Sequence, residues 1–189
     1  MKMLAQTKAL SKLQNLKTEY RDFVKTNYEH RAKSCFTCET KGACCTDAHF
    51  VNVHITRLEA VAIGQSLGRL SEEKQIEIYR RAEDAIEKYD LKIAGDTFAK
   101  TFACPLFEKN FGCLVHQDAK PASCISHACY ENREDLPPDE LQEEIESRIE
   151  KLNKRTYRNV WTWLPIPVWV DLINPFKNKT AQNNKKSAR

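Results

Sequence analysis

The sequence contains no long apolar run and only five glycines. No stretch approaches the roughly 18 apolar residues that cross a bilayer, and the start of the chain alternates lysines with apolar residues. We therefore expect no transmembrane segment, no secretory signal, and a cytoplasmic protein with reduced thiols. The sequence also lacks G-x-G-x-x-G, Walker A and C-x3-C-x2-C motifs. It therefore predicts no dinucleotide site, no P-loop and no radical chemistry with S-adenosylmethionine.

Charge is unevenly distributed along the 189 residues. The net charge is +4, but residues 177–189 hold five basic residues and no acidic one, so the rest of the chain is close to neutral. We predict a disordered basic tail at 177–189 and no nucleic-acid partner. Because 41% of the residues are hydrophobic, the remaining chain can form one modest core.

Apolar residues recur every three or four positions in several segments, which predicts a mainly α fold. Residues 1–30 are predicted to form an N-terminal helix. A capping box of Thr56 and Glu59 begins a second helix that extends towards Leu70. Ser71 caps a third helix. The apolar stripe of that helix consists of Ile76, Tyr79, Ala82, Ile86 and Tyr89.

One segment favours a strand instead. Residues 50–55, FVNVHI, alternate apolar and polar side chains, which is typical of a half-buried strand. In such a strand Val51, Val53 and Ile55 face the core, and we expect His54 to face solvent.

The region 136–176 is predicted to form a C-terminal helix, which starts after Pro138, and a tryptophan-rich strap. Pro165 and Pro167 argue against a helix in the strap, so we expect an extended segment that covers the core. Its apolar residues are Trp161, Trp163, Val168, Trp169, Val170, Leu172 and Ile173. A patch for a partner or a membrane surface is the alternative interpretation.

Eight cysteines form two groups, C-x2-C-x5-C-C and, 58 residues later, C-x8-C-x10-C-x4-C. In a reducing compartment, clustered thiols indicate metal binding or catalysis before disulfides. We therefore predict a metal-binding region at 31–135, in which irregular cysteine-rich loops surround a metal site. Adjacent residues of a regular backbone point in different directions, so we expect Cys44 and Cys45 not to share one ion. The candidate ligands are Cys35, Cys38, Cys44, Cys45, Cys104, Cys113, Cys124 and Cys129.

The kind of metal is open between iron and zinc, because thiolates suit both. Structural zinc domains usually show two short C-x2-C knuckles, and this sequence has one. Iron–sulfur sites tolerate irregular spacing, and Cys104-Pro105 is similar to the Cys-Pro of some ferredoxins. We favour an iron–sulfur cluster over Zn2+, in one site or two. His49, His116 and His127 are alternative ligands.

The segments CFTCETKGACC and CPLFEKNFGCLVHQDAKPASC resemble the YkgJ family of zinc- or iron-chelating cysteine-cluster proteins. The matching positions are Cys35, Cys38, Cys44, Cys45, Cys104, Cys113 and Cys124, with Gly42, Pro105 and Gly112 in step. His116 stands where the family has tyrosine, Lys120 where it has arginine and Phe107 where it has leucine, so roles tied to the tyrosine or arginine are not implied. The resemblance implies metal chelation, described in some members as an Fe–S oxidoreductase. Flagellin lysine methylases look similar in this segment, which adds protein modification as an alternative.

These observations predict a metal-binding protein that holds an iron–sulfur cluster, with a redox or protein-modification role. No catalytic residue can be named from the sequence. The alternative is a module with structural zinc that presents the tryptophan strap or the basic tail to a protein or nucleic-acid partner. A thioredoxin-like dithiol at Cys35 and Cys38 is not favoured, because no βαβ pattern surrounds it.

Overall fold

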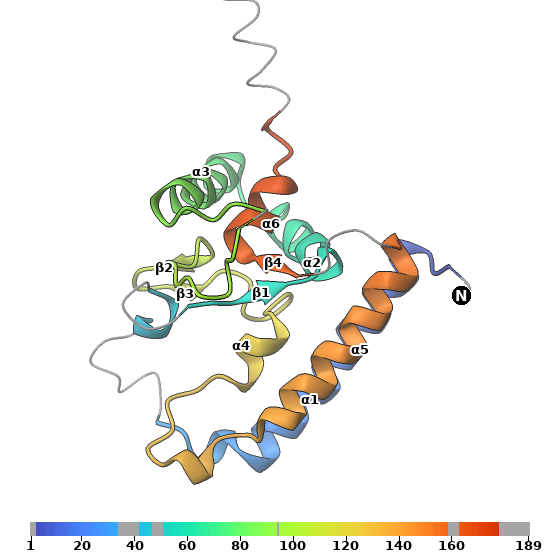
Figure 1. Ribbon diagram of the computed structural model, residues 1–189, viewed down its shortest axis with the longest axis vertical. Coiled ribbons are helices and arrows are strands. Elements are labelled where there is room, and N and C mark those ends of the chain that lie inside the picture. Colours follow the sequence, from blue (N-terminus) through green and yellow to red (C-terminus); the bar gives the residue numbers. More distant parts are fainter. Residues whose placement is uncertain (1–2, 34–41, 47–50, 94, 159–162, 178–189) are drawn as a thin grey trace, which may run out of the picture.

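The computed structural model describes residues 3–33, 42–46, 51–93, 95–158 and 163–177 (Figure 1). These residues form a mainly helical fold, as the sequence predicts, with two very short antiparallel strand pairs. The helices are α1 Gln6–Asn27, α2 Arg57–Leu67, α3 Glu72–Lys88, α4 Ala122–Ser126, α5 Asp139–Tyr157 and α6 Ile166–Leu172. The strands are β1 His54–Ile55, β2 Phe107–Glu108, β3 Gly112–Cys113 and β4 Leu164–Pro165. Within the described ranges, no helix has the length and apolar character that a membrane span requires.

The two long helices, α1 and α5, lie antiparallel along one side of the molecule (Figure 1). Their apolar faces form a hydrophobic cluster with α4, and Leu13 of α1 and Ile149 of α5 are fully buried in it. The Leu4 N–H donates to the Arg155 carbonyl oxygen at 2.9 Å, which joins the start of α1 to the end of α5. The helix predicted in the first 30 residues is therefore confirmed.

A second hydrophobic cluster lies between α2, α3 and α6 and includes the strand pair β1–β4. The two strands are antiparallel, with Ile55 opposite Leu164. Ile63 of α2, Ile78 of α3 and Val170 of α6 have no exposed surface. Of the apolar residues predicted to cover the core, Val168, Trp169 and Val170 are therefore confirmed as buried.

The predicted strap is nevertheless wrong in its conformation. Residues 166–172 form the helix α6, with Pro165 at its N-cap and Pro167 in its first turn. The first N–H groups of a helix have no intrahelical acceptor, so prolines at these positions lose no hydrogen bond. Leu172 is 43% exposed, against expectation. Trp161 lies outside the described residues.

The two predicted helix caps are confirmed. Thr56 Oγ1 accepts from the Glu59 N–H and a Glu59 carboxylate oxygen accepts from the Thr56 N–H, both at 3.3 Å. Ser71 Oγ accepts from the Lys74 N–H at 3.4 Å. The predicted stripe of α3 is wrong at Ile76, which is 48% exposed. The buried residues of the helix are Ile78, Tyr79, Ala82 and Ala85, so its buried face is rotated about the helix axis from the predicted stripe.

The predicted strand at 50–55 is shorter than expected, and His54 is buried instead of exposed. Its Nε2 lies 2.9 Å from Thr97 Oγ1, and the Phe98 ring stacks on the imidazole with centroids 4.0 Å apart. A segment more than forty residues downstream therefore covers the strand face that the alternation assigned to solvent.

The C-terminal tail lies outside the described residues from position 178. Lys177, the first residue of the predicted disordered tail, is described and donates to Asp171. The prediction of disorder is therefore wrong at Lys177.

Candidate metal centre

Five of the eight cysteines lie in three short segments: the turn before β1, the β2–β3 pair with the residues just before it, and α4 (Figure 1). Cys44 and Cys45 belong to a single 3-10 turn, Ala43–Cys45. Cys104 precedes β2, Cys113 is in β3, and Cys124 is in α4. All five are reduced thiols of intermediate exposure.

The turn that holds Cys44 and Cys45 depends on Gly42. This glycine has φ 80°, in the left-handed region that side chains rarely adopt, and a Cβ atom there would overlap the Phe107 ring. Its carbonyl oxygen accepts the Cys45 N–H at 2.8 Å. The turn can therefore pack directly against the β2–β3 pair.

Backbone hydrogen bonds join the first cysteine group to the second. The Cys104 N–H donates to the Cys45 carbonyl oxygen at 3.0 Å. In the strand pair, Cys113 stands opposite Phe107, and the Leu114 N–H donates to the Leu106 carbonyl oxygen at 2.9 Å. The two groups thus meet although 58 residues separate them.

The helix that carries Cys124 is held by a buried carboxylate of α2. Glu59 is 1% exposed, and its Oε1 accepts the N–H of Ala122, the first residue of α4, at 3.2 Å. The Cys124 N–H donates to the Pro121 carbonyl oxygen at 3.1 Å. The residue that caps α2 therefore also fixes the position of Cys124.

The thiols influence one another electrostatically. A hydrogen bond from the Cys45 thiol lowers the pKa of Cys44 to about 6 and raises the pKa of Cys45. Burial raises the pKa of Cys124 to about 12. The pKa of Cys104 is also raised, mainly by burial and to a smaller extent by the charge of Cys124. The pKa of Cys45 is raised mainly by its hydrogen bond to Cys44 and by burial, and the charges of Cys104 and Cys124 add smaller effects in the same direction. Such mutual effects require the thiols to lie near one another.

Contrary to expectation, the thiols of Cys44 and Cys45 lie within hydrogen-bonding reach of each other. The expected divergence assumed a regular backbone. The tight turn after Gly42 brings the two neighbouring side chains to the same side instead.

Two sulfur atoms also receive backbone hydrogen bonds from the residue two positions later. The Leu106 N–H reaches Cys104, and the Val115 N–H reaches Cys113; each hydrogen bond lowers the pKa of the thiol against the larger effect of burial. Hydrogen bonds from N–H groups stabilise the thiolate form, which is the form that binds metal.

Among the described residues, no three cysteine, histidine or carboxylate side chains are gathered closely enough to hold a metal ion. Cys35 and Cys38, the predicted C-x2-C pair, lie outside those residues, as does His49. Cys129 is exposed, and its carbonyl oxygen accepts the Lys33 N–H at 2.8 Å. The donor set is rich in thiols and low in oxygen ligands, which fits zinc or an iron–sulfur cluster.

The two histidines of the second group flank the thiols. His116 follows Cys113, and its N–H donates to the Cys113 carbonyl oxygen at 3.1 Å. Burial lowers the pKa of His116. The pKa of Cys44 is lowered mainly by the hydrogen bond from Cys45, and the charge of His127 lowers it further by a smaller amount.

Three charged residues near the thiols were not identified from the sequence: Lys17 of α1, Glu59 of α2 and Arg81 of α3. Glu59 was assigned only a capping role. Lys17 stands between Leu13 and Tyr20 on the apolar face of α1, which is the one sequence feature that sets it apart from the other lysines. Arg81 has no distinguishing sequence pattern.

Comparisons of the chain with protein-family models, with curated proteins and with solved structures found no match.

Proposed function

We propose that this chain is a metal-binding protein whose cysteines hold an iron–sulfur cluster, with Zn2+ as the alternative. The observation that carries the proposal is the approach of five thiols from three separate segments: Cys44, Cys45, Cys104, Cys113 and Cys124. Chance burial of single cysteines does not explain two distant groups that meet through a backbone hydrogen bond. The cysteine spacing that resembles the YkgJ family supports the same conclusion.

The chain's own residues would hold the thiols and limit water. The Leu106 and Val115 N–H groups donate to Cys104 and Cys113, and both of these apolar side chains are buried. Hydrogen bonds to sulfur and exclusion of solvent are two of the ways in which a protein tunes the potential of an iron–sulfur cluster. When bound, such a cluster supplies one-electron transfer, and we propose a redox or protein-modification role in the cytoplasm.

Metal binding would complete the folding of the cysteine segments. The described thiols lie near one another but do not form a closed site. Cys35 and Cys38, the other two cysteines of the first group, lie outside the described residues. Ligands that come together only when metal binds couple the free energy of binding to that of folding.

The alternative, a structural-zinc module, is favoured by the place of the thiols in the fold. Cys104 and Cys113 pack against one hydrophobic cluster, and the helix of Cys124 belongs to the other. A zinc ion there would cross-link the two halves of the core. In that case the partner would bind elsewhere on the surface.

The experiment is anaerobic purification followed by analysis of metal and acid-labile sulfide. We expect iron and sulfide in similar amounts and a brown protein; zinc without sulfide would favour the alternative. The double variant Cys104→Ser/Cys124→Ser should lose most of the metal. Cys129→Ser changes an exposed thiol, and the metal content of this variant shows whether Cys129 is also a ligand. Less than about half an equivalent of any metal in the wild type would refute the proposal.

A further inference from the structure

One lysine of α1 is buried. Lys8, Lys12 and Lys25 of this helix are exposed, but Lys17 is 3% exposed. Lysine is almost never fully buried unless it is paired. The environment of Lys17 therefore needs an explanation.

The carboxylate near Lys17 already has several other partners. Glu59 Oε2 accepts from the N–H and the hydroxyl of Thr56, and Oε1 accepts the Ala122 N–H at 3.2 Å. Lys17 Nζ lies 3.5 Å from Glu59 Oε1 and makes no hydrogen bond to any described residue. A charge-assisted hydrogen bond is about 2.7–2.9 Å long. An ion pair of this length does not offset the desolvation of two buried charges.

Lys17 faces the cysteines as well as Glu59. Its charge lowers the pKa of Cys124 and of Cys113, although burial is the larger effect and raises both. Burial lowers the pKa of Lys17 itself, and Glu59 and then Cys124 oppose this shift. The buried ammonium group therefore lies within electrostatic reach of two thiols from different segments.

A second cation approaches from the opposite cluster. Arg81 of α3 donates from Nη1 to the Phe107 carbonyl oxygen at 2.6 Å. Its charge lowers the pKa of Cys104, although burial is the larger effect and raises it. Its Nε and Nη2 are buried and have no hydrogen-bond partner among the described residues. Two incompletely paired cations thus flank the thiols.

We propose that Lys17 neutralises an anionic, all-thiolate metal centre. The inference rests on the proposed function and narrows it. Four thiolates around a divalent ion leave two net negative charges, whereas two thiolates and two neutral imidazoles leave none. A buried cation stabilises the first arrangement and opposes metal binding in the second. His116 and His127 are therefore not ligands.

The test measures Co2+ binding by the full chain, because thiolate-to-cobalt charge-transfer bands report thiolate ligands. In Lys17→Met, which removes the buried positive charge and keeps the Glu59 hydrogen bonds to α2 and α4, we expect Co2+ affinity to fall at least about tenfold. Lys25→Met, at an exposed position of the same helix, should bind as wild type. If Lys17→Met does not fold with Glu59 left unpaired, Lys17→Met/Glu59→Gln is compared with Glu59→Gln, so that the two proteins differ only at position 17.

Two results would overturn the inference. Affinity of Lys17→Met within about twofold of wild type, or of the double variant within about twofold of Glu59→Gln, would show that Lys17 does not act on the centre. Charge-transfer bands too weak for four thiolates would show a mixed ligand set. Both results leave the proposed function standing, whereas a wild-type protein that binds no Co2+ and carries neither iron nor zinc after anaerobic purification would refute the proposed function as well.

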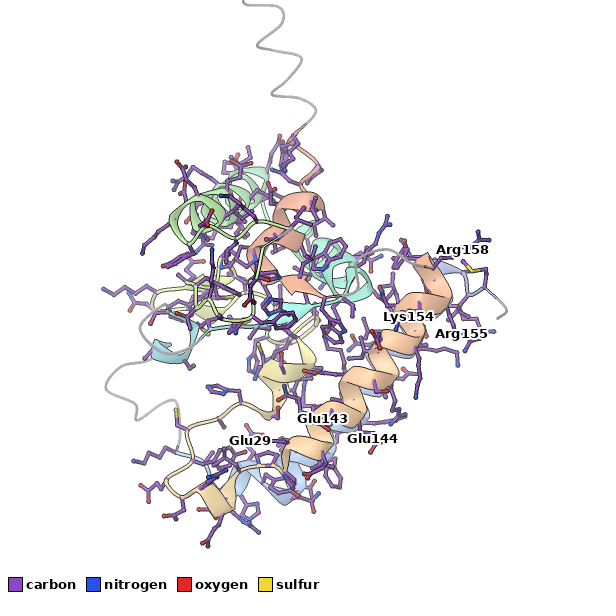
Figure 2. All side chains as sticks on the ribbon, viewed as in Figure 1. Glu29, Glu143, Glu144, Lys154, Arg155 and Arg158 are labelled. Carbon is purple, nitrogen blue, oxygen red and sulfur yellow. The ribbon has the colours of Figure 1, made fainter. Side chains whose placement is uncertain are left out.

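A second inference comes from the charges of α1 and α5. The first turns of α5 are acidic and lie beside the end of α1, near Glu29, whereas its last turns are basic and lie beside the start of α1 (Figure 2). The labelled residues are Glu29, Glu143 and Glu144 at one end and Lys154, Arg155 and Arg158 at the other. Between these two ends, Arg148 of α5 pairs with Glu19 of α1 at 4.0 Å.

The helix dipole accounts for this pattern only in α5, where acids stand at the N-terminus and bases at the C-terminus. The first turn of α1 has no acidic residue. Between the two helices runs a groove that is apolar towards the acidic end and basic towards the other. The apolar part is lined by Leu16, Tyr20, Phe23, Leu141 and Ile145. The charged residues that line the basic part are Lys12, Arg148, Lys151 and Arg155, with one acid, Glu19.

The geometry points to a second copy of this chain on the α1–α5 face, packed antiparallel about a twofold axis. This orientation places the basic end of each copy on the acidic end of the other and covers Phe23, which is 45% exposed. A twofold interface uses the same patch on both copies, and paired helices on each side give a four-helix arrangement.

The test is the mass of the full chain by analytical ultracentrifugation over a range of concentrations and salt. We expect a dimer that dissociates at high salt. Glu144→Lys and Lys151→Glu should each be monomeric, and an equimolar mixture of the two should dimerise again. Lys109→Glu, on an exposed turn away from the face, should remain dimeric. A monomeric wild type at every concentration, or a dimer unaffected by both reversals, would overturn the inference.

Discussion

The Cys104 N–H donates to the Cys45 carbonyl oxygen at 3.0 Å, so the two cysteine groups are joined through the backbone and not only through their side chains. This contact fixes the distance between the groups before any metal is bound. A metal ion would therefore meet thiols that the fold has already brought together, with the segment that contains Cys35 and Cys38 as the remaining part.

The turn before Cys44 should tolerate no side chain at Gly42. Gly42→Ala adds a Cβ atom at positive φ that overlaps the Phe107 ring, so we expect unfolding free energy to fall by about 1–3 kcal/mol and metal content to fall with it. Gly68→Ala is the matched control, because Gly68 is in the right-handed helical region and a Cβ there meets the Gly64 and Gln65 carbonyl oxygens at 3.4 and 3.7 Å. Urea unfolding and metal analysis compare the two; equal losses would contradict this account.

Metal binding should release protons at neutral pH. Burial raises the pKa of Cys104, Cys113 and Cys124, the last to about 12, so these thiols are protonated at pH 7 without metal. Each that becomes a ligand loses one proton, and Zn2+ affinity should rise about tenfold per pH unit for each such thiol. Calorimetry in buffers of different ionisation enthalpy counts the protons. Cys124→Ser should release about one fewer; an unchanged count would exclude Cys124 as a ligand.

Stability should fall in mild acid because of His54. Burial lowers the pKa of His54 below its usual value of 6.5, so the unfolded chain takes up the proton more readily. The folded state is therefore favoured at high pH and loses stability as pH falls from about 6.5 through the folded pKa. We expect the unfolding free energy to be lower at pH 5 than at pH 7.5. His54→Gln should remove this part of the pH dependence and exposed His30→Gln should not, as urea unfolding at each pH would show.

The C-terminal helix should be essential to the core. Trp169 is 4% exposed in the cluster between α2, α3 and α6, so Trp169→Ala should destabilise the protein by about 3–5 kcal/mol. A chain that ends at Lys177 should melt as the full chain does. A chain that ends before Trp161 should aggregate, because the removal of Leu164, Ile166 and Val170 exposes the core residues that they cover. A soluble, metal-loaded short chain would contradict a structural role for α6.

The sequence by itself determined the helical class, the positions of the helix caps and the grouping of the cysteines. These depend on local effects: Thr56 and Glu59 cap a helix through neighbouring atoms, and the period of the apolar residues in α1 selects its buried face. The same local rules misjudged α6, since a proline that interrupts a helix is harmless in its first turn.

Only the tertiary structure decided which charged and polar groups are buried. His54 is covered by Thr97 and Phe98, and Lys17 is enclosed beside Glu59 where α2 and α4 meet α1. The hydrogen bond between Cys45 and Cys104 likewise joins positions that no local pattern connects. Burial of this kind depends on which distant segment packs on which face, and the free energy of that packing is a property of the whole core and not of any short stretch.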